Sequence, residues 1–415
     1  MSAAAPEFPR SPAPLEGGGP GSLRGDHLER DVLVAGAGLP GLAAAIALAR
    51  AGLSVALVDR QALAVPEADP ATWDTRIYAI SPGSAAFLRS IGVWQSLPEE
   101  RIALVEAMHI EGDRGAVLRF DAYELAERAL AWIVEERALR AALVEQVHGA
   151  GVEVVAPAAF ASLAWTATSG TLALDDGRRV SGRLVVGADG LRSWVRNAAG
   201  IVAEPRPYGQ TAVVANFACE RPHDGVARQW FLAGGGILAW LPLPGARISI
   251  VWSAPEAQAF TLATLDPDTL ADRVADAGAR VLGRLSCITP PAAFPLRFLR
   301  LPSVTAHRLA LVGDAAHGVH PLAGQGVNLG FGDAQALAAV EAARGGVGDP
   351  GAPILLERYA RRRAAPVAAM QAVTDGLARL FGSSAPGLAM LRNLGLTAVS
   401  NLPTLRQALA QPALR

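Results

Sequence analysis

The sequence predicts an α/β protein built from three kinds of segment. The first is a strand, turn, helix and strand between Asp31 and Asp59, with the sequence DVLVAGAGLPGLAAAIALARAGLSVALVD. The second is a series of short β-prone stretches from Ile201 to about Phe298, and the third is a helical pattern from Ile354 onward. Alternating strands and helices favour a parallel sheet, whereas consecutive short strands favour an antiparallel one.

Length and composition exclude several classes of protein. The 415 residues, 51% hydrophobic and 18% charged, suffice for one large or two ordinary domains with a full core, which excludes a disordered chain. The 37 basic and 38 acidic residues nearly cancel, so we expect no nucleic-acid partner. All basic residues are arginine, which excludes Schiff-base and P-loop lysine chemistry. Cys219 and Cys287 lack disulfide or metal-ligand spacing, and a reducing cytoplasm is expected.

The start of the chain predicts neither a signal nor a membrane span. Residues 1–29 are rich in Pro, Gly and Ala and lack the basic start and apolar stretch of a secretory signal, so a flexible tail is expected. The uncharged run from Val32 to Ala49 is long enough to span a bilayer. Its glycines and Pro40 instead favour a buried strand, turn and helix, and no transmembrane segment is predicted.

This run contains the motif Gly36-x-Gly38-x-x-Gly41. Gly36 permits a sharp turn, Gly38 lets the backbone approach a pyrophosphate, and Gly41 lets the helix pack closely on the strand. The helix N-terminus offers free N–H groups and the positive end of its dipole to the phosphates. Asp59, at the end of the second strand, is placed to accept hydrogen bonds from an adenosine ribose. The unit predicts a Rossmann-like site for FAD or NAD.

Two later segments distinguish FAD from NAD, and they also resemble a known family. They are RLVVGADGLRSWVR, from Arg183 to Arg196, and RLALVGDAAHGVHPLAGQGVNLGFGDAQAL, from Arg308 to Leu337. Together with the first motif they resemble the class A flavin-dependent aromatic hydroxylases. Within that group the chain is most similar to the ubiquinone-biosynthesis hydroxylases of the UbiH/VisC type, through HPLAGQGVNLGFGDAQAL, DTRIYAISPGSAAFLRSIGVW and LAWIVEERALRAAL. The resemblance covers roughly residues 30 to 400.

The resemblance implies how the chain is divided. It implies a Rossmann-like FAD-binding domain, with the fold of p-hydroxybenzoate hydroxylase (PHBH type), assembled from residues 30–100, 126–205 and 299–353. Residues 101–125 and 206–298 would form a substrate domain around an antiparallel sheet, and residues 354–415 a C-terminal helical region.

The resemblance also implies an activity, that of an FAD-dependent monooxygenase. Reduced flavin would react with dioxygen, the co-substrate, to form a C4a-hydroperoxide that hydroxylates the ring of a polyprenylphenol in ubiquinone biosynthesis. NAD(P)H or a partner reductase would be the transient electron donor, because the sequence has a single dinucleotide fingerprint. No catalytic acid or base can be named from the sequence.

The residues themselves also favour FAD. Asp314, at the end of an apolar strand, can accept hydrogen bonds from a ribityl chain, which NAD lacks. Pro321, Gly324 and Gly326 form a loop with few side chains, so a flat ring could lie against its backbone. A helix beginning near Val327 would direct its N-terminus at that ring and stabilise negative charge there.

Further cofactor contacts follow from the resemblance, which implies that Arg76 lies near the flavin and pyrophosphate and that Arg137 contacts the cofactor from the start of a helix. A solvated surface arginine is the alternative for each, and an ordinary turn or N-cap is the alternative for Asp189 and Asp314. The predicted cofactor-binding residues are Gly36, Gly38, Leu39, Pro40, Gly41, Asp59, Arg60, Arg76, Arg137, Asp189, Gly313, Asp314, Pro321, Gly324, Gln325, Gly326, Val327 and Asn328.

The β-rich region is expected to supply the substrate pocket. Trp230, Trp240 and Pro321 are the predicted pocket residues, with an ordinary core position as the alternative for each aromatic side chain. His317 and His320 are three residues apart, but Pro321 follows directly and no third ligand is nearby, so no metal site is predicted.

The C-terminal region leaves location and partners open. The apolar stretch from Leu377 to Leu396, with arginines near it, could touch a membrane surface or a partner in a ubiquinone-biosynthesis complex. We expect a hydrophobic prenylated phenol as substrate and a cytoplasmic location, peripheral at the inner membrane, and a homo-oligomer stays open. The alternative functions are an FAD-dependent dehydrogenase or reductase and a non-catalytic flavoprotein subunit of a biosynthetic complex. A halogenase is excluded because it needs a lysine.

Overall fold

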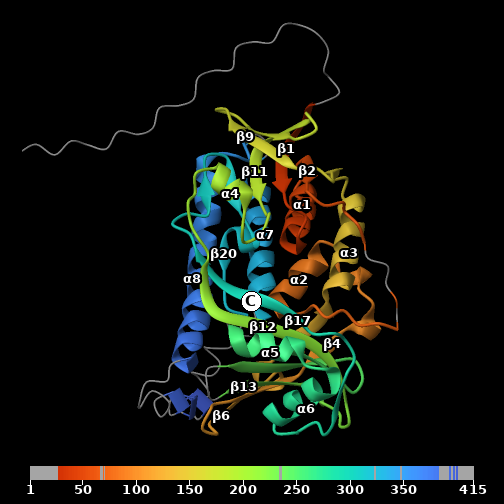
Figure 1. The fold of residues 1–415 in the computed structure, drawn as a ribbon. Coiled ribbons are helices and arrows are strands. Elements are labelled where there is room, and N and C mark those ends of the chain that lie inside the picture. The colour runs from red at the N-terminus through yellow and green to blue at the C-terminus, as the bar shows by residue number, and fades with distance from the viewer. Residues whose placement is uncertain are drawn as a thin grey trace, which may run out of the picture.

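The computed structural model describes residues 27–65, 69, 71–232, 236–321, 324–345, 348–382, 392–393, 396–397 and 399–400. Figure 1 shows a mixed sheet at one end of the molecule and a largely antiparallel sheet at the other, with the long helix α8 (Pro353–Gly382) running beside both. The fold is therefore the α/β arrangement that the sequence predicts.

The first sheet is parallel at its centre, in the strand order β18-β19-β11-β1-β2-β8, and β9 and β10 extend it through antiparallel pairs. Its strands are β1 His27–Ala35, β2 Val55–Val58, β8 Glu153–Val155, β9 Phe160–Trp165, β10 Gly170–Leu174, β11 Arg179–Gly187, β18 Thr305–Ala306 and β19 Leu309–Leu311. Val32, Leu33 and Val34 are fully buried, as expected for a strand covered on both faces.

The first strand starts earlier than the sequence suggests. His27 pairs with Arg179 of β11, and its ring Nε2 lies 2.7 Å from the hydroxyl of Ser181. The last three residues of the predicted tail therefore belong to β1. The cause is the length of β11, whose nine residues give the incoming chain a partner along their whole length.

The second sheet has the order β20-β17-β12-β15-β14-β13-β5-β6, with β16 paired to β12. Its strands are β5 Ala107–Glu111, β6 Val117–Asp121, β12 Arg206–Cys219, β13 Val226–Phe231, β14 Ile237–Leu243, β15 Arg247–Pro255, β16 Leu285–Cys287, β17 Ala292–Arg300 and β20 His317–Gly318. The early strands β5 and β6 join it because β5 pairs in parallel with β13. Helices α5 (Glu256–Thr264) and α6 (Pro267–Ala277) pack on one of its faces.

A third, three-stranded sheet, in the order β3-β7-β4, lies next to α3 and α7. Its strands are β3 Ile77–Ile80, β4 Ala103–Val105 and β7 Ala131–Glu135. The other helices are α1 Leu39–Arg50, α2 Pro82–Ser90, α3 Glu136–Gly149, α4 Trp194–Ala198 and α7 Gly326–Ala342, with 3-10 turns η1 Trp94–Ser96, η2 Glu99–Arg101, η3 Tyr123–Leu125 and η4 Gly313–Ala315.

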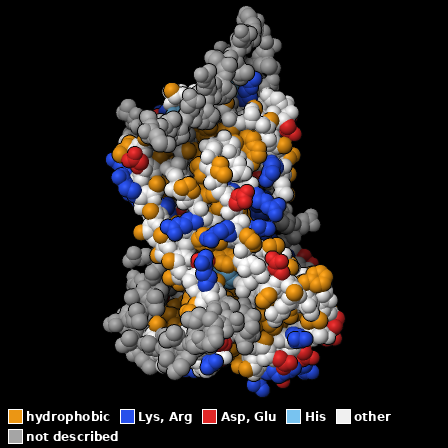
Figure 2. Space-filling model, turned by 60° about the vertical axis from the view of Figure 1, so that its left-hand side comes forward, with side chains coloured by type: hydrophobic (Ala, Val, Ile, Leu, Met, Phe, Trp, Pro, Cys, Tyr) orange, Lys and Arg blue, Asp and Glu red, His pale blue; other side chains and the backbone are white. Residues whose placement is uncertain are grey.

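The surface and the C-terminal region bear on the partners expected from the sequence. On the face drawn in Figure 2, basic and acidic side chains are interspersed, so this face carries no extended surface of one charge. Within the described residues, no helix is both long and apolar enough to cross a bilayer. The stretch from Leu377 to Leu396, expected to touch a membrane or a partner, lies partly outside the described residues.

Candidate cofactor and substrate site

The glycine loop between β1 and α1 is shaped by close backbone packing. A Cβ atom on Gly36, whose φ is +111°, would lie 2.4 Å from the carbonyl oxygen of Ala188, and a Cβ on Gly41 would lie 2.0 Å from that of Gly36. Both positions therefore exclude any side chain. A Cβ on Gly38 would meet only the Cδ of Pro40, at 4.0 Å, so the neighbouring residues do not require glycine there. The loop is thus closed toward the protein at Gly36 and Gly41 and open to a ligand at Gly38.

Two side chains hold this loop in place. The Asp59 carboxylate accepts hydrogen bonds from the amide nitrogens of Ala37, at 2.5 Å, and Gln61, at 2.7 Å. Arg140 of α3 donates to the carbonyl oxygen of Ala37 at 3.0 Å. Asp59 was predicted from the sequence, whereas Arg140 was not, because nothing in an ordinary amphipathic helix marks one arginine as facing the loop.

A second turn meets the glycine loop at η4. Gly313 has a φ of +61°, and a Cβ there would lie 3.1 Å from the Cγ of Pro40. The next residue, Asp314, is deep in the molecule yet exposed to the cavity described below. Among the described residues none donates a hydrogen bond to its carboxylate. Burial raises the pKa of Asp314, so a hydroxyl donor from a ligand would relieve an unfavourable site.

A buried group of charges fixes this turn from behind. Asp333 of α7 accepts hydrogen bonds from the backbone nitrogen of Gly313 at 2.9 Å and from Nε of Arg363 at 2.6 Å, and Nε2 of His317 lies 2.6 Å from it. Burial alone would lower the pKa of His317, but the adjacent carboxylate of Asp333 raises it. Burial alone would raise the pKa of Asp333, but His317 and Arg363 hold it below its usual value.

No sequence motif marks Asp333 or Arg363 as site residues. The available signal was a lone acid at a position that an apolar helix buries, in VNLGFGDAQAL, because a buried carboxylate needs a partner of opposite charge. The partner could not be identified from the sequence, since Arg363 is one of three consecutive arginines on α8.

A second clamp comes from α4. The Asp189 carboxylate accepts hydrogen bonds from the hydroxyl of Ser193 at 2.5 Å and from the backbone nitrogens of Trp194 and Val195 at 2.7 and 3.0 Å. It therefore caps α4, which is the alternative that the sequence left open for this residue. Arg196 of the same helix is 1% exposed and donates to the carbonyl oxygens of Ala315 and Leu191, both at 3.0 Å. Helix α4 thus ties the η4 turn to the loop after β11.

A cavity of about 1340 Å³ lies between these turns and the second sheet. Pockets for a single small ligand usually measure about 300–1,000 Å³, so this one has room for a flat ring and a second molecule. We call its cofactor side the cradle, formed by Gly38 to Pro40, Gly313 to Asp314, Pro321 and Gly324 to Val327. We call its opposite side the sheet wall, formed by Ala212, Val214, Ala227, Gln229, Phe231, Ile237, Ala239, Leu241, Val251 and Ser253 of β12 to β15.

The structure brings most of the predicted cofactor residues to this cavity. Those that line it are Gly38, Leu39, Pro40, Arg76, Gly313, Asp314, Pro321, Gly324, Gln325, Gly326 and Val327. Those that the cavity lining does not include are Gly36, Gly41, Asp59, Arg60, Arg137, Asp189 and Asn328. Several of the second group hold the first in position. Asn328, for example, donates to the carbonyl oxygen of Ala79 at 2.8 Å and accepts from the backbone nitrogen of Ser81 at 3.1 Å.

The two predicted arginines differ in their surroundings. Arg76 lines the cavity, where it pairs with Glu136 at 2.9 Å and lies over the ring of Phe294, 4.8 Å from its centroid. The guanidinium of Arg137 instead lies 3.2 Å from the carboxylate of Glu135 and donates to the hydroxyl of Thr72 at 3.0 Å. Arg76 is therefore the arginine that faces the cavity.

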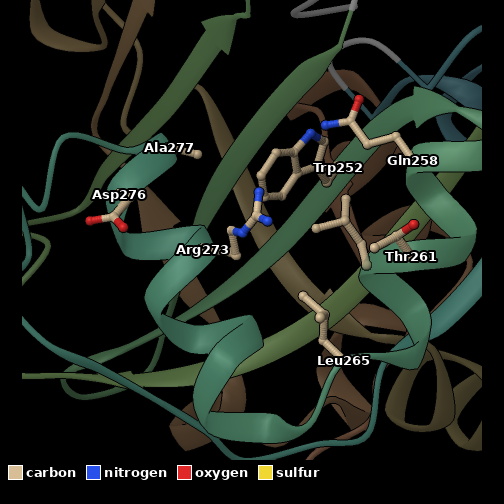
Figure 3. A pocket seen from close by; sticks show the side chains of 8 residues that line it. Trp252, Gln258, Thr261, Leu265, Arg273, Asp276 and Ala277 are labelled. Atoms are coloured by element: carbon tan, nitrogen blue, oxygen red, sulfur yellow. The ribbon is translucent and has the colours of Figure 1, made fainter.

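The tryptophans expected in the pocket lie elsewhere. Trp230 and Trp240 are 6% and 1% exposed and pack on each other, with ring centroids 4.8 Å apart, in the core between the sheet and helices α5 and α6. Figure 3 shows Trp252 of the same face directed toward α5 and α6, beside a smaller pocket of about 450 Å³. Successive residues of a strand point to opposite faces, so these tryptophans face away from the cavity and belong to the core. Of the predicted pocket residues, Pro321 lines the cavity.

The two histidines do not form a pair. His317 contacts Asp333, whereas Nε2 of His320 lies 2.9 Å from the side-chain oxygen of Gln210, and burial lowers the pKa of His320 to about 4. Over the described part of the chain, no three His, Cys, Asp or Glu side chains cluster as metal ligands would.

These features fit FAD. The open position at Gly38 lies at a helix N-terminus, as a pyrophosphate requires, and the unpaired carboxylate of Asp314 suits the hydroxyls of a ribityl chain. The loop at Pro321 and Gly324, followed by the start of α7, presents backbone rather than bulky side chains to a flat ring.

Comparisons with known proteins agree with this geometry. Residues 29–374 match the family described as "FAD binding domain". The chain is 37% identical to the ubiquinone hydroxylase UbiL of Rhodospirillum rubrum, over 92% of this chain and 89% of that protein. It is 34% identical to the 3-demethoxyubiquinol 3-hydroxylase of Escherichia coli, over 91% and 97%. Human COQ6, a ubiquinone biosynthesis monooxygenase, is 33% identical over 91% of each chain.

Solved structures extend the comparison to the fold. PqsL of Pseudomonas aeruginosa, in complex with 2-aminobenzoylacetate, aligns with a TM-score of 0.74 at 25% identity, over 89% of this chain and 100% of that one. HpxO of Klebsiella pneumoniae, in complex with FAD and uric acid, has the same fold with a TM-score of 0.73 at 19% identity, over 93% and 97%. The resemblance seen in the sequence is confirmed: the chain belongs to the FAD-binding-domain family, in the group that includes the hydroxylases and monooxygenases of ubiquinone biosynthesis.

Proposed function

We propose that this protein is an FAD-dependent monooxygenase that hydroxylates the aromatic ring of a polyprenylphenol in ubiquinone biosynthesis. The observation that carries the proposal is a single cavity that joins the cradle to the largely apolar sheet wall. A cofactor and an apolar substrate can therefore lie side by side without water between them. The names of the relatives, hydroxylases and monooxygenases of the ubiquinone pathway, support the same reaction.

The cradle residues would bind and orient the cofactor. Gly38 would admit the pyrophosphate, Asp314 would accept hydrogen bonds from the ribityl hydroxyls, and Pro321 and Gly324 would lie beside the ring. When bound, FAD supplies the activation of dioxygen for transfer of one oxygen atom to an electron-rich ring. NAD(P)H or a partner reductase would deliver the electrons in a transient encounter, and dioxygen would be the co-substrate.

The sheet wall would exclude water and position the substrate. Eight of its ten residues are apolar, so a phenol ring and an attached prenyl chain would replace water along the whole wall. Exclusion of water matters because activated oxygen is otherwise lost to solvent. Arg76, paired with Glu136 and stacked on Phe294, would keep a positive charge at the cradle edge of this apolar space.

The apolar cavity also bears on location. Its lining continues past Phe231 to Phe381 and Leu396, which suits a substrate with a long apolar tail. Such a substrate resides in a bilayer. We therefore propose that the protein is cytoplasmic and meets the inner membrane, or a ubiquinone-biosynthesis complex, to collect it.

Oxygen-18 labelling tests the function. Purified protein loaded with FAD would be incubated with a prenylphenol, NAD(P)H and ¹⁸O₂, and the product examined by mass spectrometry. We expect one labelled oxygen atom in the ring, and none when the label is supplied as water. Oxidation of the substrate without label would indicate a dehydrogenase. Bound FAD with no turnover under any reductant would indicate a non-catalytic subunit.

A further inference from the structure

Two polar side chains, Gln229 and Ser253, lie on the sheet wall, and Gln229 is the larger of them. On β13 the alternate residues Ala227, Gln229 and Phe231 line the cavity, and the facing residues of β14, Ile237, Ala239 and Leu241, are apolar. Gln229 is therefore an amide in the middle of an apolar surface. Its neighbour Arg228 also borders the cavity, but the guanidinium of Arg228 lies 3.3 Å from Nδ1 of His109.

The amide of Gln229 has no hydrogen-bond partner among the described residues. The residue is 5% exposed, and within the described chain its side chain neither donates nor accepts a hydrogen bond. Neither its side-chain nitrogen nor its side-chain oxygen is completely inaccessible, so both can be reached from the cavity. A buried amide without a partner is unfavourable, and a ligand in the cavity would supply the missing hydrogen bonds.

The strand register places Gln229 between two parts of the cavity. Two residues before it, Ala227 packs in one cluster with Ala79, whose Cβ would lie 3.3 Å from a Cβ on Gly324 of the cradle. Two residues after it, Phe231 stacks on Phe381 of α8, with ring centroids 3.6 Å apart. Each of these steps along the strand is roughly 7 Å. Gln229 thus lies one step from the cradle side and one step from an aromatic side, where Phe231 stacks on Phe381 and Arg392 lies over the Phe381 ring.

We propose that Gln229 determines substrate specificity by hydrogen-bonding an oxygen substituent on the substrate's aromatic ring, while the substrate's apolar tail runs past Phe231 and Phe381. An amide can donate to a carbonyl or ether oxygen and accept from a hydroxyl, so it suits a phenol or a quinol. A ring without oxygen would leave the amide unpaired and bind more weakly. This inference rests on the proposed function, because it assigns the ring to that same cavity.

Binding of two probes to the FAD-loaded protein tests this role. The probes are a hexylphenol and hexylbenzene, which differ in a single hydroxyl, and binding would be followed by the change in flavin absorbance. We expect the wild-type protein to prefer the phenol. Gln229→Leu should weaken phenol binding about tenfold and leave hexylbenzene binding unchanged or tighter. Gln229→Met serves as a second variant of similar length should Gln229→Leu fold poorly.

A matched control comes from the same row of the sheet wall. Val251 lines the cavity beside Ala239, which pairs with Gln229. Val251→Ala should weaken both probes by a similar factor, because it removes apolar contact and no hydrogen bond. Unchanged phenol binding in both Gln229 variants, equal losses for the two probes, or no binding of either probe to the wild type would overturn the inference. A retained phenol preference without oxygen-18 incorporation would instead overturn the proposed function and leave the inference intact.

Discussion

The two sides of the cavity are built on different principles. On the cradle side, the backbone determines the shape: directly behind the cradle, Gly36 and Gly41 must be glycine because a single added carbon would collide with a carbonyl oxygen. On the sheet wall, the side chains determine the shape, because alternate residues of each strand face the cavity and their backbone positions are those of any sheet. We infer that the cradle tolerates little change and selects the cofactor, whereas the sheet wall can change residue by residue and selects the substrate.

The largest effect is expected behind the cradle, in the glycine loop, from Gly41→Ala. Its new Cβ would lie 2.0 Å from the carbonyl oxygen of Gly36, so β1 and α1 must separate. We expect a loss of more than about 5 kcal/mol in the free energy of unfolding, measured by urea denaturation. Gly38→Ala is the matched control, because its Cβ meets nothing closer than 4.0 Å. It should unfold like the wild type, and a large destabilisation would show that the loop is not open at this position.

The next largest effect concerns the charges behind the cradle. Asp333→Ala would leave His317 and Arg363 buried without their carboxylate, at a cost of about 3–5 kcal/mol in the free energy of unfolding. Thermal and urea unfolding would measure it. Asp314→Asn, in the same turn, is the control and should destabilise the protein far less, because no described residue donates a hydrogen bond to that carboxylate. A loss below about 1 kcal/mol in the free energy of unfolding for Asp333→Ala would mean that His317, Asp333 and Arg363 do not fix the η4 turn.

A smaller effect is expected from Glu341, a buried acid outside the cavity, and concerns the pH dependence of the free energy of unfolding. Glu341 of α7 is fully buried, and neither of its carboxylate oxygens has a hydrogen-bond partner within the described part of the chain. Burial raises its pKa to about 7. The unfolded chain releases this proton near the ordinary pKa, so the free energy of unfolding should fall as pH rises from about 4.5 to 7, by roughly 3 kcal/mol.

The variant Glu341→Gln isolates this contribution. It should remove most of that pH dependence and be more stable than the wild type at pH 8, while FAD binding is unchanged. Urea unfolding at pH 5 and pH 8 measures it. A wild type and variant with parallel pH profiles would assign the dependence to other groups.

The smallest effect tests the two faces of the second sheet. Trp240→Phe changes the face that packs on α6, where Trp240 contacts Trp230. We expect a loss of about 1–2 kcal/mol in the free energy of unfolding and unchanged affinity for FAD and for the hexylphenol probe. A change in probe affinity without a change in stability would show that Trp240 lines the substrate pocket and not the core.

The difference between the two sides also explains what the sequence could predict. The turns on the cradle side can be recognised from local sequence. Gly36, Gly38 and Gly41 follow one strand, and Gly313 and Asp314 follow another. Their spacing alone predicts turns that bind a ligand. The sheet wall has no local mark. Which residues face the cavity depends on the phase of each strand relative to its neighbours, and Trp230 and Gln229, adjacent in sequence, lie on opposite faces.

Residues that hold the site residues in position could not be predicted from the sequence either. Arg363 binds Asp333, which holds Gly313, and Arg140 binds the carbonyl oxygen of Ala37. Both come from helices distant in the chain, and only the packing of α8 and α3 brings them there. Asp189 shows the converse: its motif was recognised, but its carboxylate caps α4. A motif thus predicts the position of a loop more reliably than it predicts what each side chain in that loop contacts.

A titration of cofactor-free protein with FAD, followed by absorbance and by quenching of flavin fluorescence, tests the cradle most directly. We expect a yellow protein that binds one FAD per chain. Asp314→Asn and Gly38→Ala should bind FAD at least about tenfold more weakly while unfolding like the wild type. A protein that stays colourless, or variants that bind FAD as tightly as the wild type, would contradict this prediction.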